Sequence, residues 1–212
     1  MYSGLGKAFR ESALFHWYKK LAAPAEYLWW RLRGSPPSRT PHWLKQRIIQ
    51  QYGREFHLPV LIETGTNFGQ MLYAQRRNFR ELYSIELDAW RAESAQRKFA
   101  GQPRIHILRG DSGDVLPKLL ETIQEPCLFW LDGHDWDTST PVKRELDALF
   151  KHPVQGHVVL IDDAKWFDGR SDYPTIEELR ERVAREYAGH VVEVKDEVIR
   201  IHQPRPRSSP GA

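Results

Sequence analysis

The chain has 212 residues, a net charge of +3 and 28% charged residues, so it is long enough for one α/β domain with a full core. A hydrophobic content of 41%, without any run of about 18 apolar residues, excludes both a disordered chain and a protein with several membrane spans. A single cysteine, Cys127, excludes an internal disulfide and a cysteine-based zinc site, and no apolar segment typical of a secretory signal follows the first basic residues, so we expect a cytoplasmic protein.

The first 54 residues differ in charge from the rest of the chain. They hold ten Lys or Arg against two acids, a charge of +8, whereas the remaining 158 residues carry −5. Residues 5–33 predict one or two amphipathic helices interrupted near Pro24, residues 34–41 predict a linker, and a further helix is expected around residues 42–52. We expect residues 1–54 to form a helical extension that caps a larger domain.

Aromatic residues lie between the basic residues of this extension, over residues 7–33. Lysine and arginine with interleaved indoles suit an anionic lipid surface, which predicts a peripheral membrane contact. Two alternatives remain open: the aromatic side chains pack on the sheet or cover the active site, or they form a homodimer interface. So many indoles are unusual in a nucleic-acid patch, so we expect no nucleic-acid partner.

From residue 58 onward, short apolar runs alternate with longer segments of helical period. The runs cover residues 58–63, 82–87, 104–110, 127–132 and 157–162. The helical segments cover residues 69–79, 88–99, 113–124, 141–151 and 175–188. This alternation is typical of a doubly wound, mostly parallel sheet.

Two further apolar runs close the folded part, at residues 190–194 and 198–202, and predict an antiparallel hairpin at a sheet edge. We therefore expect one domain over residues 55–203. Residues 204–212 are rich in proline and poor in apolar side chains, which predicts a disordered tail.

The first strand runs into Glu63, Gly65, Asn67 and Gly69, an E-x-G-x-x-x-G turn that leads into a helix. Glycines let the backbone come close to a bound ligand, although an ordinary strand-to-helix turn explains the pattern equally well. The spacing differs from the G-x-G-x-x-G of dinucleotide sites.

Acidic residues follow the next two strands. Glu86 ends the second strand, where a carboxylate can accept hydrogen bonds from both ribose hydroxyls of a nucleoside. Asp111 and Ser112 follow the third strand and can read an adenine edge, although Asp111 also suits a turn or a helix cap.

The order of these motifs resembles the class I S-adenosylmethionine-dependent methyltransferases over residues 58–202. The motifs that carry the resemblance are ETGTNFG, LYSIELD, LRGDS, FWLDGH and LIDDA. The resemblance implies a Rossmann-like, seven-stranded sheet with a reversed last strand, and S-adenosylmethionine (SAM) as cofactor. It also implies that Gly65 and Gly69 border the methionine portion of SAM and that Glu63 orients its amino group. By the same resemblance, Glu86 holds the ribose and Asp111 the adenine.

One departure from the family lies in the glycine turn. Many members have a third glycine where this chain has Asn67, so the loop is expected to be less open.

Three carboxylates follow the fourth and fifth strands: Asp132, Asp162 and Asp163. Such close like charges repel each other unless a cation or protons neutralise them, and an oxygen-only ligand set favours Mg²⁺. His134 nearby would also admit Mn²⁺ or another transition metal. Alternatively, Asp162 and Asp163 cap a turn and only Asp132 contacts the cofactor.

The same acids resemble those of metal-dependent O-methyltransferases that act on catechols and macrolide sugars, in which an Asp after strand four and an acidic pair after strand five bind magnesium. The implied reaction is O-methylation of a hydroxylated small molecule, sugar or glycan, with His134 or Asp135 taking the proton. The catechol enzymes have a lysine where this chain has Asp135, which leaves the identity of the base open. The rival predictions are a metal-independent methyltransferase and a non-catalytic scaffold of the same fold.

Overall fold

The computed structural model describes residues 13–34, 40–133, 140–170 and 172–204. Seven strands form one sheet in the order β3-β2-β1-β4-β5-β7-β6. The strands are β1 (Val60–Thr64), β2 (Glu81–Glu86), β3 (Ile105–Arg109), β4 (Cys127–Leu131), β5 (Val158–Ile161), β6 (Val191–Lys195) and β7 (Val198–His202). The first five pair in parallel, and β7 is antiparallel to both β5 and β6. The predicted seven-stranded, Rossmann-like fold is confirmed.

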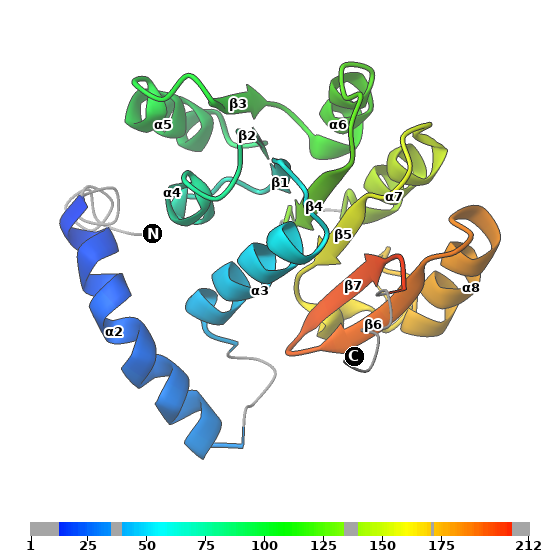
Figure 1. Ribbon diagram of the computed structural model, residues 1–212, viewed down its shortest axis with the longest axis horizontal. Helices are drawn as coiled ribbons and strands as arrows, with labels where there is room; N and C mark the ends of the chain where they lie inside the picture. The colour runs from blue at the N-terminus through cyan, green and yellow to red at the C-terminus, as the bar shows by residue number, and fades with distance from the viewer. Residues whose placement is uncertain (1–12, 35–39, 134–139, 171, 205–212) are drawn as a thin grey trace, which may run out of the picture.

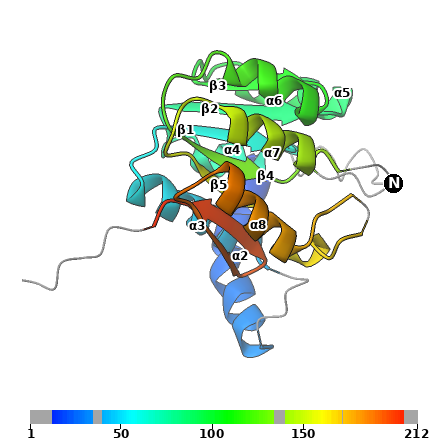
Figure 2. The same ribbon diagram turned by 90° about the vertical axis from the view of Figure 1, so that its right-hand side faces the viewer.

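Helices cover both faces of this sheet (Figures 1 and 2). The helices of the described residues are α2 (Ala13–Leu32), α3 (His42–Glu55), α4 (Gln70–Gln75), α5 (Ala89–Phe99), α6 (Ser112–Leu120), α7 (Val142–Lys151) and α8 (Ile176–Glu186), with a short 3₁₀ turn η2 (Ala164–Trp166). All but α2, which packs on α3, lie against the sheet. No helix within the described parts of the chain is long and apolar enough to cross a membrane.

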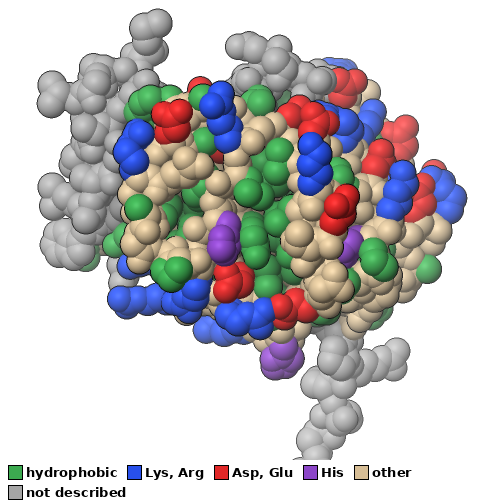
Figure 3. All heavy atoms as spheres, turned by 90° about the horizontal axis from the view of Figure 1, so that it is seen from above, with side chains coloured by type: hydrophobic (Ala, Val, Ile, Leu, Met, Phe, Trp, Pro, Cys, Tyr) green, Lys and Arg blue, Asp and Glu red, His purple; other side chains and the backbone are tan. Residues whose placement is uncertain are grey.

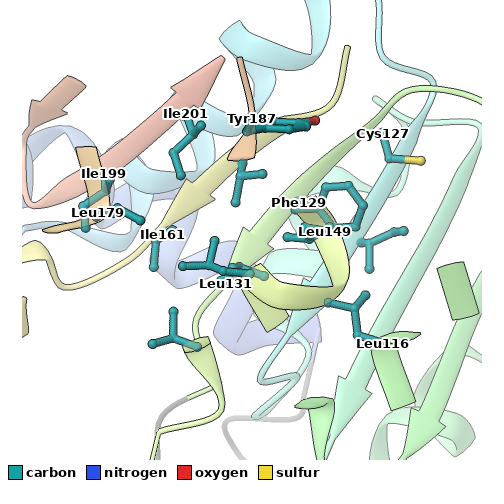
Figure 4. Packing of buried hydrophobic residues seen from close by; sticks show 14 of the residues in the cluster. Leu116, Cys127, Phe129, Leu131, Leu149, Ile161, Leu179, Tyr187, Ile199 and Ile201 are labelled. Carbon is teal, nitrogen blue, oxygen red and sulfur yellow. The ribbon is translucent and has the colours of Figure 1, made fainter. Parts of the chain in front are cut away.

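The pleat of the buried strands divides the core into two clusters. Phe129, Leu131 and Ile161 point toward α6, α7 and α8 (Figure 4), whereas Trp130 and Leu160 face α3, α4 and α5. Because successive side chains alternate between the faces, runs such as CLFWL must be apolar at every position. This explains why the strands appear in the sequence as continuous apolar runs.

The N-terminal segment differs in one respect from the prediction. Helix α2 runs without interruption past Pro24, although the sequence suggested a break there. Proline removes one backbone hydrogen bond, but a helix can continue through it with a local bend.

Helix α3 packs directly on the domain, where Ile48, Ile49 and Tyr52 enter the core cluster of Trp130 and Leu160. The extension predicted over residues 1–54 therefore includes an element of the domain core. Residues 205–212 of the predicted tail lie outside the described part of the chain.

Candidate functional site

The carboxyl ends of the central strands lie side by side along one rim. The backbone N–H groups of Gly65, Asp132 and Asp162 donate to carbonyl oxygens at or next to the ends of β2, β1 and β4, over 2.9, 3.1 and 3.0 Å. Each of these residues begins the loop that follows its own strand. The loops that carry the predicted site residues therefore start next to one another, which is where open α/β sheets bind ligands.

The glycine turn after β1 depends on unusual backbone angles. Gly65 has φ +85°, and a Cβ added to it would lie 2.3 Å from the carbonyl oxygen of Asp132. Gly69 has φ +66°, and its added Cβ would lie 2.8 Å from the ring of Phe99. Asn67 also adopts a left-handed conformation, with φ 50°, which asparagine tolerates better than most residues. Asn67 thus keeps a backbone shape typical of glycine.

Glu86 is held against this turn. Its carboxylate accepts the backbone N–H of Asn67 at 2.8 Å on one oxygen and that of Asp88 at 3.0 Å on the other, and the residue is 5% exposed. Asp88 caps helix α5, since its side chain accepts from the N–H of Arg91 at 2.8 Å. The structure therefore brings Glu86 and the glycine turn together.

A buried chain of hydrogen bonds lies behind the turn. Ser84 donates to the carboxylate of Glu63 at 2.8 Å, and the hydroxyls of Thr66 and Ser84 lie 2.6 Å apart. Glu63 is almost completely buried, and this burial raises its pKa well above its ordinary value, against the opposing hydrogen bond from Ser84. A cationic group beside Glu63 would favour its ionised form.

Asp111 caps helix α6 and pairs with Arg144. Its carboxylate accepts the N–H of Gly113 at 2.8 Å and two N–H groups of Arg144 at 2.9 and 2.8 Å. Among the described residues, the contacts of Asp111 are therefore those of a helix cap and of an ion pair. An adenine amino group would have to share the Asp111 oxygens with Arg144.

Ser112 follows Asp111 and lies near an acid that the sequence analysis did not single out. The hydroxyls of Ser112 and Thr64 lie near the carboxyl group of Glu145, on α7, and act to lower its pKa. Glu145 is 1% exposed, and burial raises its pKa to about 7. A buried acid therefore lies beneath the predicted cofactor site.

The three acids predicted to bind a metal lie in one electrostatic cluster with a lysine. Lys45, from the first turn of α3, forms a salt bridge with Asp162. Burial, followed by the charge of Asp162, raises the pKa of Asp132 well above its ordinary value, and the charge of Lys45 opposes this effect. Burial acts to lower the pKa of Lys45, but the charges of Asp162, Asp132 and Asp163 outweigh it, so the pKa is raised. This acidic cluster is thus partly neutralised by the protein itself.

The contacts of the cluster do not fit a divalent ion. Asp162 receives Lys45 on one oxygen and the N–H of Asp163 on the other, while Asp163 pairs with Lys165 at 3.1 Å. Within the described ranges, no three His, Cys, Asp or Glu side chains are arranged to hold a metal ion. His134 and Asp135, the predicted base candidates, lie outside the described residues.

Lys45 and Glu145 are charged residues of this region that sequence reasoning missed, as is Arg144 beside Asp111. Lys45 is one of ten basic residues before residue 55, and nothing in the sequence separates it from the others. Glu145 did leave a signal, because it shares the buried helical stripe of Val142, Leu146 and Leu149. An acid on an apolar helix face predicts a buried carboxyl group.

Comparisons with known proteins support the fold. No protein-family model matches the chain, and no curated protein matches its sequence. Solved structures do match. The O-methyltransferase TomG from Streptomyces achromogenes, in complex with SAM, is 17% identical with a TM-score of 0.56, over 76% of this chain and 80% of that one. An O-methyltransferase from Bacillus cereus, in complex with S-adenosylhomocysteine (SAH), is 15% identical with a TM-score of 0.53, over 76% and 81%.

A third match is MycE, a methyltransferase of mycinamycin biosynthesis solved with Mg, SAH and mycinamycin VI. It is 18% identical with a TM-score of 0.53, over 82% of this chain and 51% of that one. At these identities the likeness establishes a fold, and that fold is the one of the SAM-dependent methyltransferases.

Proposed function

We propose that this chain is a SAM-dependent methyltransferase that methylates a hydroxyl group of a small molecule, sugar or glycan. The observation that carries the proposal is Glu86, whose carboxylate is fixed by two backbone N–H groups beside the left-handed turn of Gly65 and Asn67. This geometry suits a ribose at the rim. The matched structures named as O-methyltransferases support the choice of oxygen as the acceptor atom.

The charges and hydrogen-bonding groups of the rim residues suit the cofactor. Glu86 would accept the ribose hydroxyls, the glycine turn would lie along the methionine portion, and the carboxylate of Glu63 would attract the amino group. Asp111, Ser112 and Asp132 would border the remainder. SAM, when bound, supplies a methyl group on a positively charged sulfur. The protein must then hold the acceptor oxygen in line with that methyl group and accept its proton.

The residues that we propose as the base, His134 and Asp135, lie outside the described part of the chain. His134 and Asp135 come two and three residues after Asp132 in the sequence, and Asp132 lies at the rim, so either residue is near enough in the chain to take the proton. The sequence also predicted Mg²⁺ at Asp132, Asp162 and Asp163. Because Lys45 already contacts Asp162, we derive no step through a metal ion.

We also propose that helix α2 binds an anionic membrane surface. The ring of Tyr27 packs against Trp43 of α3 and against Trp30 of its own helix, with ring centroids 5.4 and 6.0 Å apart. The opposite side of the helix exposes an apolar stripe consisting of Leu21, Leu28, Trp29 and Leu32.

On the face of the molecule shown in Figure 3, acidic and basic side chains alternate, which suits a polyanion such as nucleic acid poorly.

Two measurements test the enzymatic proposal. Calorimetry of the full chain should show SAM binding, and incubation of SAM with hydroxylated acceptors should release SAH. Cofactor binding without SAH from any hydroxylated acceptor would favour the scaffold alternative. Repeating an active assay in EDTA, with and without added Mg²⁺, tests the predicted ion: lost activity that Mg²⁺ restores would support it, and full activity in EDTA would remove it.

A further inference from the structure

The acidic cluster contains a cation that belongs to the chain. The Lys45 ammonium contacts one carboxylate oxygen of Asp162, in a pair whose side chains are 16% and 2% exposed. The other oxygen of Asp162 accepts the backbone N–H of Asp163 at 2.8 Å. Both oxygens of the most buried acid are therefore engaged by donors.

We propose that the ammonium group of Lys45 is the resident cation of this cluster and occupies the place at which the sequence suggested a divalent ion. A buried carboxylate must be paired or protonated, and Lys45 supplies the pairing charge. A metal ion at Asp162 would have to displace Lys45 and leave a largely buried ammonium without its partner. Such a displacement is unfavourable, because an unpaired buried charge destabilises a protein more than a formed pair stabilises it.

The position of Lys45 gives α3 a second role. This helix is part of the basic N-terminal segment, and Lys45 joins it to the end of β5. An ammonium group has three N–H donors, and among the described residues Asp162 takes one of them. Lys45 therefore ties α3 to the rim of the sheet at the acidic cluster.

Metal binding by the full chain tests the resident cation directly, with Mn²⁺ as the probe and free Mn²⁺ followed by electron paramagnetic resonance. We expect the wild-type protein to show no saturable Mn²⁺ binding with a Kd below roughly 1 mM, which corresponds to a binding free energy of about −4 kcal/mol. The Lys45→Ala variant should bind Mn²⁺ at least about tenfold more tightly, because the carboxylates then lack their cation. Wild-type binding with a Kd under about 100 μM that Asp162→Asn abolishes would overturn the proposal.

A double-mutant cycle provides a second test that needs neither metal nor substrate. Lys45→Met leaves Asp162 unpaired, and adding Asp162→Asn should recover about 5 °C of the lost melting temperature. Lys45→Arg keeps the charge and should retain most of the stability, which guards against a poorly folded Lys45→Met variant.

Arg182→Ala is the control, since it removes ion pairs to Asp147 and Glu186 on a distant face, and Asp162→Asn should not rescue it. Additive effects of Lys45→Met and Asp162→Asn would contradict the proposal, and either test can fail while SAM binding stands.

Discussion

At the scale of single residues, strand β2 carries two carboxylates, one at the predicted cofactor site and one far from it. Glu86 ends the strand at the rim, whereas Glu81 begins the strand at its other end and pairs with His106 at 2.8 Å. Glu86→Gln removes the charge but keeps the shape, and we expect SAM to bind at least about tenfold more weakly, the loss of one charge-assisted hydrogen bond. Glu81→Gln should leave the affinity unchanged. Calorimetry on both variants checks this, and equal affinities would place the ribose elsewhere.

Glu145 predicts an unusual pH dependence of stability. Burial raises its pKa from 4.5 to about 7, so the folded protein favours the neutral acid. The resulting stability is fully present below pH 4.5 and is lost as the pH rises through about 7. Glu145→Gln cannot ionise, so its stability relative to the wild type should be about 3 kcal/mol higher at pH 8 than at pH 4.

Urea unfolding at both pH values measures this difference. Glu177→Gln on the exposed first turn of α8 is the matched control and should show no such change. A Glu145→Gln effect that is equal at pH 4 and pH 8 would show that the carboxyl group is ionised in the folded protein.

The candidate site was predictable from the sequence where a residue's place follows from a strand end. Glu86 and Asp162 end or follow apolar strands, so the parallel sheet puts them on one rim without further information. Lys45 could not be predicted, because its place depends on how α3 packs against the sheet. The two hydrogen bonds to Asp111 from Arg144 depend in the same way on the packing of α7 against α6.

At the scale of elements, the turn between β1 and α4 depends on Gly65 for its conformation. Alanine there would require a left-handed backbone and would place its Cβ against the carbonyl of Asp132. We expect Gly65→Ala to destabilise the protein by at least about 2 kcal/mol. Gly101→Ala, at a position with no heavy atom within 4 Å of an added Cβ, should change stability by less than about 0.5 kcal/mol. Chemical denaturation compares the two, and a Gly65→Ala protein of normal stability would mean that the turn can adopt another shape.

Most elements could be predicted because their local signals agree with the fold. Thr175 and Glu178 form a capping box at the start of α8, and the acids of its first turn reinforce it. Pro24 shows the limit of such signals, since proline usually ends a helix and α2 continues through it. Local propensity is a weak guide there, because the loss of one hydrogen bond is small against the packing of α2 on α3, which includes Tyr27 on Trp43.

At the scale of the whole molecule, charge and apolar surface are distributed unevenly. The segment over residues 1–54 carries +8 and the rest −5, and α2 extends from the domain in Figure 1 while packing against α3. Arg33 lies over the exposed indole of Trp29, 3.9 Å from its centroid. An apolar stripe flanked by arginine matches the two attractions of an anionic bilayer, apolar burial and headgroup charge.

Sedimentation of the full chain with vesicles therefore tests the proposed membrane contact. Vesicles containing phosphatidylserine should bind the protein, and pure phosphatidylcholine vesicles should bind much less. The double substitution Leu28→Ser and Trp29→Ser should weaken the binding roughly tenfold or more, because each buried apolar side chain contributes about 1.5–3 kcal/mol. Val194→Ser, an exposed apolar residue of β6, is the control and should bind normally. Equal sedimentation of both variants would exclude this face of α2, and a concentration-dependent dimer that the double substitution dissolves would assign the stripe to a second copy of the chain.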